Sequence, residues 1–297
     1  MSSGSATGFD PATHLGSVTL RVSDLDAMVG FYSGGVGLEV IDRSADRVVL
    51  GSGGVVSVEL LARPDLGPAP RGSAGLYHTA ILFTERTDLA AAISATATST
   101  KGSFTGSADH LVSEAFYFDD PEGNGVELYW DRPRAQWRWT DGAIAMDSLP
   151  LDPNAYIRTH QADVDAPVAP LGARTTLGHV HLKVGTIDTA HAFYVGALGF
   201  DVTTAMGSSA LFTSAGGYHH HVGMNVWESR GAPVMTESLG LERFTIVVPD
   251  AGELAATAAR LDAAGRGYER TDGPRGDGVR TTDPWGTVVD VVADTNP

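Results

Sequence analysis

Four related units recur along the chain, and this internal repeat constrains the fold more than any other feature. The first opens with LGSVTLRVSDLDAMVGFYSGGVGLEV at 15–40 and the third with LGHVHLKVGTIDTAHAFYVGALGFDV at 177–202. Each combines an alternating strand, a Ser/Thr-and-Asp helix start, an amphipathic helix ending in Phe-Tyr, a glycine stop and a second strand. The second unit opens at 76–93 and closes with DPEGNGVELY, and the fourth opens at 241–261 and closes with DPWGTVVDVV. The repeat predicts an α+β fold that uses a strand, a helix and several further strands four times.

The spacing of the units predicts two domains of two units each. We expect a flexible tail at 1–13, an N-terminal domain at 14–131, a connector at 132–176 and a C-terminal domain at 177–294. The connector is rich in Pro, Asp and Ala and lacks sustained periodicity, which is typical of an interdomain segment.

Composition limits the classes of partner. The 297 residues carry a formal charge of −16, and the 20 Lys and Arg form no run, so nucleic acid and anionic membrane are disfavoured. No apolar stretch has membrane-spanning length, and the start lacks the basic and apolar regions of a secretory signal, so we expect a cytoplasmic protein that binds a small molecule or another protein. Because the chain has no Cys, any metal must be held by His and carboxylate.

Histidines stand at matching positions in the second and third units. Side chains alternate faces along a strand, so His179 and His181 share one face of their strand, opposite Val180 and Leu182. His78 takes the place of His179 in unit two. The closing strand of that unit supplies an acid, Glu127, seven residues after the Asp of its Asp-Pro turn.

The other two units lack this set. Ser17 and Arg243 occupy the histidine position in units one and four, and Asp290 occupies the position of Glu127 in unit four. We interpret Arg243 and Asp290 as a salt bridge in a site without metal and Ser17 as structural.

The candidate metal ligands are therefore His78, Glu127 and His179. A single strand histidine or glutamate is more often structural or solvated, and only their coincidence at matching repeat positions favours a site. Two imidazoles and one carboxylate with open positions opposite suit non-haem Fe(II), which must hold an organic ligand and O2 together.

The unit resembles the βαβββ module of the vicinal oxygen chelate (glyoxalase-like) superfamily. The run from His110 to Glu127 resembles the signature of type I extradiol ring-cleaving dioxygenases, departing from it only at Ala108. The whole chain is similar to the Bacillus-type catechol 2,3-dioxygenase group, with LYHTAI, GHVHL and GGYHHHVGMNVW as further likenesses. The matching positions of the signature are His110, Phe116, Tyr117, Asp120, Pro121, Gly123 and Glu127.

The resemblance implies an enzyme of aromatic hydrocarbon catabolism that uses Fe(II), or Mn(II), to insert O2 into a catechol next to its vicinal hydroxyls. It implies a homo-oligomer whose His110 and Tyr117 hydrogen-bond and protonate the substrate or an intermediate. It also implies a catalytic histidine within 218–221 that takes the substrate proton. Alternation allows His220 on one face, or His219 and His221 on the other, and we predict His220.

One departure concerns the position of the signature, which lies in the second unit rather than in the last of the four. The metal site should therefore pair units two and three, leaving units one and four a metal-free cavity. Two other functions remain open on the same fold. A glyoxalase-type isomerase or lyase using Ni(II) or Zn(II) would need a further protein ligand, and a small-molecule-binding (resistance) protein would keep its affinity without His78.

Overall fold

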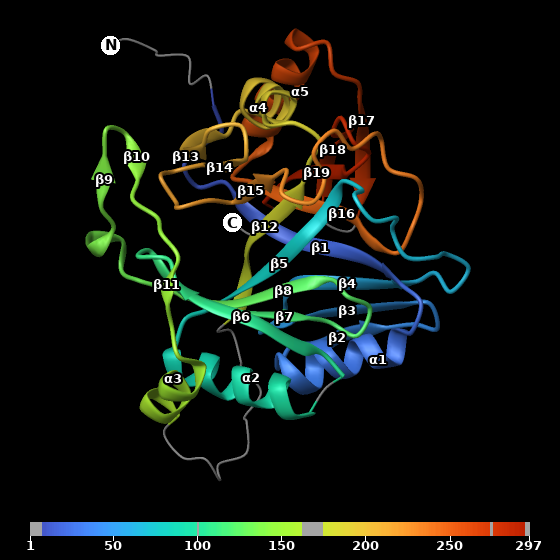
Figure 1. Ribbon diagram of the computed structural model, residues 1–297. Helices are drawn as coiled ribbons and strands as arrows, with labels where there is room; N and C mark the ends of the chain where they lie inside the picture. Colours follow the sequence, from blue (N-terminus) through green and yellow to red (C-terminus); the bar gives the residue numbers. More distant parts are fainter. Residues whose placement is uncertain (1–7, 100, 162–174, 274–275, 295–297) are drawn as a thin grey trace.

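The secondary structure repeats one order of elements, a strand, a helix and three more strands, four times. The computed structural model describes residues 8–99, 101–161, 175–273 and 276–294 (Figure 1). Unit one consists of β1 (His14–Val22), α1 (Leu25–Val29), η1 (Gly30–Gly35), β2 (Glu39–Arg43), β3 (Arg47–Ser52) and β4 (Val55–Ala62). Unit two consists of β5 (Gly75–Phe83), α2 (Arg86–Ser99), β6 (Ser103–Asp109), β7 (Ser113–Asp119) and β8 (Gly125–Asp131).

The second half of the chain follows the same order and confirms the α+β class with four βαβββ modules. Unit three consists of β12 (Thr175–Lys183), α4 (Ile187–His191), η3 (Ala192–Leu198), β13 (Asp201–Met206), β14 (Ala210–Ser214) and β15 (Val222–Asn225). Unit four consists of β16 (Gly240–Val248), α5 (Ala251–Ala263), β17 (Tyr268–Gly273), β18 (Gly276–Thr282) and β19 (Val288–Ala293).

The strands form two large sheets, and each sheet joins one unit from each half of the chain. Units one and four form the order β17-β18-β19-β16-β1-β4-β3-β2, and units two and three form β11-β6-β7-β8-β5-β12-β15-β14-β13. The opening strands join the units, because β1 pairs antiparallel with β16 and β5 with β12. Unit two therefore pairs with unit three, as the sequence predicts. The domain boundaries at 14–131 and 177–294 stay a prediction.

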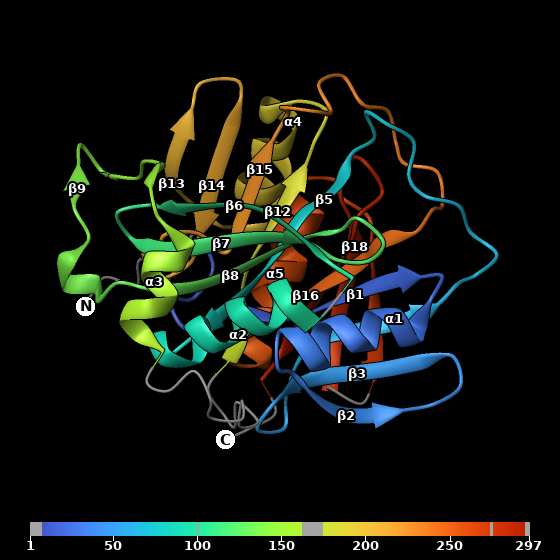
Figure 2. The same cartoon turned by 60° about the horizontal axis from the view of Figure 1, so that its bottom comes forward.

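Helices begin where the sequence supplies a capping side chain. Asp24, Thr186 and Asp250 each accept a hydrogen bond from a backbone N–H of the first turn, which satisfies donors that a helix start leaves free. Helices α1, α2 and α3 lie toward the bottom of Figure 1, and α4 and α5 toward its top. The turned view shows α2 beside α3 (Figure 2).

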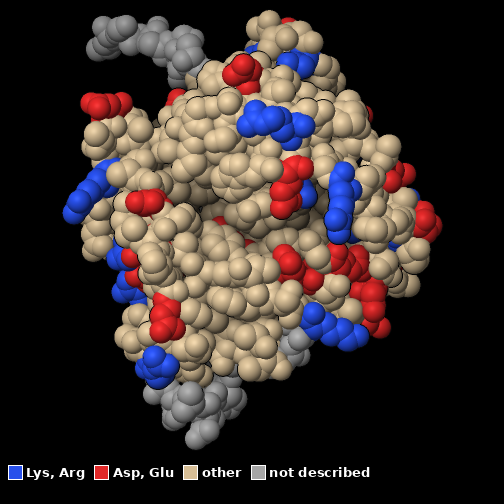
Figure 3. Space-filling model, in the orientation of Figure 1, with Lys and Arg blue, Asp and Glu red and all other residues tan. Residues whose placement is uncertain are grey.

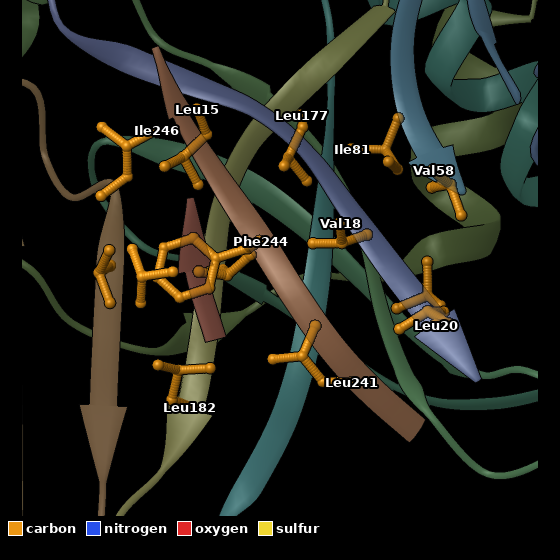
Figure 4. Packing of buried hydrophobic residues seen from close by; sticks show 14 of the residues in the cluster. Leu15, Val18, Leu20, Val58, Ile81, Leu177, Leu182, Leu241, Phe244 and Ile246 are labelled. Carbon is orange, nitrogen blue, oxygen red and sulfur yellow. The ribbon is translucent and has the colours of Figure 1, made fainter. Parts of the chain in front are cut away.

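The main core lies between the central strands of the two sheets. Strands β1 and β16 of one sheet lie against β12 and β5 of the other, and their apolar side chains are buried together (Figure 4). This packing occupies one face of β5 and β12, so the opposite face is left for other chemistry. The side chains drawn there include Leu15, Val18, Leu20, Val58, Ile81, Leu177, Leu182, Leu241, Phe244 and Ile246.

The predicted tail and connector contain ordered structure. The Phe9 ring packs edge-on against Phe200 at 4.7 Å between centroids, and residues 1–7 lie outside the described residues. The connector contributes strand β11 to the edge of β6, and residues 162–174 lie outside the described residues. Its elements are η2 (Arg134–Gln136), β9 (Trp139–Thr140), β10 (Ala143–Ile144), β11 (Leu149–Pro150) and α3 (Pro153–His160). Among the described helices, none is long and apolar enough to cross a membrane.

Candidate metal centre and cavity

Strand register brings the predicted ligands of units two and three into one row. Ala80 on β5 pairs with His179 on β12 and with Glu127 on β8, and Tyr117 on β7 pairs with Glu127. Directly paired residues of adjacent strands project to the same face. The small side chain of Ala80 therefore leaves a space between Glu127 and His179, and His78, two residues earlier, enters it from the same strand.

A β-bulge aims His179 at this space. The register of β12 against β5 shifts between Leu177 and His179, so Leu177 joins the core while His179 faces the other way. Gly178 stands in the shift, and a Cβ there would meet the Tyr129 hydroxyl at 1.7 Å. Only glycine allows this approach.

The three candidate ligands meet at one carboxylate oxygen. His78 Nε2 lies 2.9 Å and His179 Nε2 3.1 Å from Glu127 Oε2, and all three residues are buried. The contact from His179 is a hydrogen bond, whereas the contact from His78 does not meet hydrogen-bond geometry, which leaves His78 Nε2 without a hydrogen-bond partner. A buried, unpartnered imidazole nitrogen beside another imidazole and a carboxylate fits a divalent first-row metal.

Burial and charge keep these groups in the form that binds a cation. Burial lowers the pKa of His179 to about 4 against the attraction of Glu127. Burial alone would raise the pKa of Glu127, but the interactions with His179 and His78 outweigh it and hold the pKa well below its usual range. At neutral pH His179 thus offers a neutral imidazole and Glu127 an ionised carboxylate.

A cavity of about 680 Å³ is lined by His78 and Glu127, and His179 lies behind them outside the lining. Phe212 and Met206 line one wall, and Trp227, which is 52% exposed, stands at the mouth. The space-filling view shows the surface hollowed near the middle of this face (Figure 3). Lys183 and Glu228 also line the cavity and approach each other to 3.7 Å. The volume suits a single small organic ligand.

His110 and Tyr117 are neighbours at the cavity. His110 Nδ1 lies 2.7 Å from the Asp147 carbonyl oxygen, so Nδ1–H donates and Nε2 accepts from the Tyr117 hydroxyl at 2.7 Å. Burial, and then the charge of Glu127, raises the pKa of Tyr117 well above its usual value. Tyr117 is therefore protonated at neutral pH.

Of the three consecutive histidines, His220 lines the cavity. Its ring lies 4.1 Å from that of His179, and burial lowers its pKa well below the usual range, so it is neutral. His219 and His221 are buried elsewhere: His219 Nε2 lies 2.9 Å from Asp131, and His221 Nδ1 accepts the Ala215 N–H at 3.1 Å. Strand alternation allowed either His220, or His219 and His221, to face the site. The position of His220 in the cavity lining favours the predicted His220.

His181 is a further histidine of the site that the repeat pattern did not predict. His181 lines the cavity beside His78, with 4.9 Å between their rings, and burial lowers its pKa well below the usual range. Asn225 Oδ1 accepts the Trp227 N–H, which turns the amide N–H toward His181 Nε2 at 3.0 Å. That nitrogen is consequently an acceptor and no metal ligand. The alternation of side chains along β12 places His181 on the same face as His179, which was a signal that it lines the site. The contact with Asn225, which keeps His181 Nε2 from binding a metal, was not visible in the sequence.

The corresponding positions in units one and four hold an ion-pair cluster. Arg243 Nε lies 3.6 Å from Asp290, which confirms the predicted salt bridge, and Arg280 pairs with the same carboxylate through two nitrogens. Arg243 also reaches Glu59 at 3.0 Å, and Ser17 is buried nearby in β1. Among the described residues, the two groups of His, Asp or Glu that could share a cation both come from units two and three.

Comparison with known proteins agrees with this architecture. The chain is 37% identical over 271 residues to a catechol-2,3-dioxygenase of Bacillus subtilis (strain 168), covering 90% of this chain and 93% of the relative. A solved putative dioxygenase of B. subtilis superposes with a TM-score of 0.67 at 14% identity, covering 95% of this chain and 85% of the other. Glyoxalase I of Zea mays superposes with a TM-score of 0.57 at 18% identity, covering 96% and 93%. Both structures share the fold.

Residues 14–128 and 176–291 match the family model described as Glyoxalase/Bleomycin resistance protein/Dioxygenase superfamily. The match covers each pair of units in turn, from the opening strand to the closing strand. With the repeated βαβββ modules and the relative from B. subtilis, it shows that the chain belongs to this superfamily.

Proposed function

We propose that the protein is an extradiol dioxygenase that opens the ring of a catechol-type diol next to its vicinal hydroxyls with O2. The observation that carries the proposal is the convergence of His78, Glu127 and His179 beside a cavity. Two of the three, His78 and Glu127, line that cavity together with His220 and Tyr117. The relative named as a catechol-2,3-dioxygenase supports it. Both oxygen atoms enter the product, a carboxylate with a conjugated carbonyl, so the reaction needs no external reductant.

His78, Glu127 and His179 would hold Fe(II), with Mn(II) an alternative that the same donors accept. When bound, the metal supplies the redox chemistry and lowers the pKa of a catechol hydroxyl. The Glu127 carboxylate reduces the charge of the site to one positive unit, which suits a singly deprotonated diol.

The other residues would manage protons and orientation. His220 is neutral and faces the cavity, so it can accept a hydroxyl proton from the diol. Tyr117, kept protonated by its raised pKa, can donate a hydrogen bond to a substrate oxygen. The Asp147 carbonyl orients the His110 ring. When no ligand competes for the Tyr117 hydroxyl, His110 Nε2 accepts a hydrogen bond from it.

The donor set favours this activity over a glyoxalase-type isomerase. The candidate groups among the described residues contain three donors each, which leaves positions for both a diol and O2, whereas the isomerase needs a further protein ligand. A drug-binding protein of the same fold would need no metal. The cytoplasmic location and the homo-oligomeric state stay predictions.

The test is anaerobic reconstitution with Fe(II), followed by a panel of catechols with O2 uptake and the yellow ring-opened product as readouts. We expect turnover in the wild-type protein and none above background in Glu127→Gln. Glu59→Gln removes a comparably buried carboxylate from the other sheet and should retain activity. Absence of O2 uptake with every catechol, or full turnover in Glu127→Gln, would reject the proposal.

A further inference from the structure

A buried chain of hydrogen bonds runs from His220 away from the cavity. His220 Nδ1 lies 2.8 Å from His219 Nδ1, and His219 Nε2 lies 2.9 Å from Asp131 Oδ1. The Tyr218 hydroxyl donates to Asp131 Oδ2 at 2.7 Å and lies 2.7 Å from the hydroxyl of Tyr129. The reaction outlined above uses only the first of these five residues.

The direction of each hydrogen bond follows from the carboxylate. The Asp131 carboxylate accepts the Tyr218 hydroxyl, and as an acceptor it requires that His219 Nε2 carry a hydrogen and donate it. A neutral imidazole has one N–H, so His219 Nδ1 is an acceptor. The partner nitrogen, His220 Nδ1, must then donate, and the hydrogen of His220 lies on the side away from the cavity. Its Nε2 is left with a lone pair.

The reverse order would need a doubly protonated His219 that donates from Nδ1. His219 is 1% exposed and its ring lies within 6 Å of those of His179 and His220, at 5.8 and 4.7 Å between centroids. The single N–H of His219 is already directed at Asp131, so the hydrogen between the two Nδ1 atoms belongs to His220.

We propose that Asp131 and His219 are positioning residues that fix the tautomer of His220, so that its Nε2 can accept a proton from a bound diol. The proposal rests on the proposed function for the identity of the diol, but the tautomer itself does not depend on turnover. The arrangement follows the logic by which the aspartate of a serine protease triad holds its histidine in one tautomer.

The direct test is ¹⁵N NMR of histidine-labelled, metal-free protein, in which protonated and unprotonated ring nitrogens have distinct chemical shifts. The signals of His220 are assigned by their loss in His220→Gln. We expect a protonated Nδ1 and an unprotonated Nε2 in the wild-type protein. A protonated Nε2 would overturn the proposal, and this measurement requires neither a variant of Asp131 nor activity.

Variants then test the route through His219. Asp131→Leu should give a mixture of the two His220 tautomers and lower kcat by about 10² to 10⁴-fold, with KM and metal content nearly unchanged. Tyr218→Phe is the matched control, because it removes the other hydrogen bond to Asp131 and should leave the His220 signals unchanged. An unaltered tautomer in Asp131→Leu would contradict the proposal.

The double variant shows whether the two residues act as one. Asp131→Leu added to His219→Leu should lower kcat no further, because the connection to His220 is already cut. Additive losses would contradict action through His219. A wild-type protein without any catechol turnover would reject the proposed function, yet the tautomer measurement would still decide the positioning claim.

Discussion

Tyr117 and His110 form a hydrogen-bonded pair beside the candidate metal site, and neither is one of its three predicted ligands. The Tyr117 hydroxyl donates to His110 Nε2, and its interaction with Glu127 contributes to its raised pKa. Its effect on the reaction should thus appear in the chemical step.

Tyr117→Phe should lower kcat by about 10² to 10⁴-fold, the range for loss of a positioned proton donor, while bound iron stays at the wild-type level. Steady-state kinetics and elemental analysis measure the two quantities. Tyr194→Phe is the control, since it removes a buried hydroxyl that donates to Asp283 at 3.0 Å away from the cavity. Loss of iron in Tyr117→Phe would mean that the hydroxyl supports the ligands instead.

Residue types and repeat positions were sufficient to predict which groups would meet. His78, Glu127 and His179 are separated by up to a hundred residues, yet matching positions in paired modules must approach one another. Asp131 could not be recognised in this way, because its partners in the hydrogen-bond chain come from a loop in another unit. Such contacts depend on loop conformation, which no periodicity records.

At the level of secondary structure, the bulge in β12 decides which way His179 points. A regular strand would place Leu177 and His179 on the same face, and the register shift at Gly178 separates them. The sequence showed the alternation beyond this point but not the shift. The close approach of Tyr129 from β8, which makes glycine necessary, exists only in the folded sheet.

Gly178→Ala should destabilise the protein by about 1–3 kcal/mol, the usual cost of an overpacked core site, and should weaken metal binding as His179 is displaced. Gly106→Ala in β6 is a suitable comparison, because its added Cβ meets nothing within 4 Å. Chemical denaturation and iron titration measure the two effects. Equal stability of the two variants would argue against a tight contact at Gly178.

On the scale of the whole molecule, the two sheets share one topology but differ in what fills the space between paired units. Histidines and Glu127 occupy it in one sheet, while Arg243, Asp290 and Glu59 form an ion-pair cluster in the other. The fourfold repeat made the overall fold predictable. The order of strands at the sheet edges was not, since β11 comes from the connector, where no periodic pattern exists.

Buried neutral histidines should make the stability of the metal-free protein depend on pH. Burial lowers the pKa of His221 to about 3, below the usual 6.5 of an unfolded chain. Between about pH 3 and pH 6.5, the unfolded state therefore binds more protons at His221 than the folded state does. The contribution of neutral His221 to the free energy of unfolding is fully present above about pH 6.5 and is lost as the pH falls.

His221→Asn can preserve an acceptor for the Ala215 N–H but does not titrate. Between about pH 6 and pH 5, the free energy of unfolding of the wild-type protein should fall more steeply than that of the variant, by about 1.4 kcal/mol per pH unit. Urea denaturation at several pH values gives both slopes. Parallel slopes would show that His221 is not held neutral by the fold.

The most direct measurement of the central claim is anomalous X-ray scattering at the iron edge from crystals of the Fe(II)-reconstituted protein. We predict one peak at about 2.0–2.2 Å from His78 Nε2, His179 Nε2 and a Glu127 oxygen, the bond lengths usual for a first-row divalent metal. His179, His219 and His220 form the other group of residues that could hold a metal ion. A peak between those three residues, or no peak beside Glu127, would contradict the account.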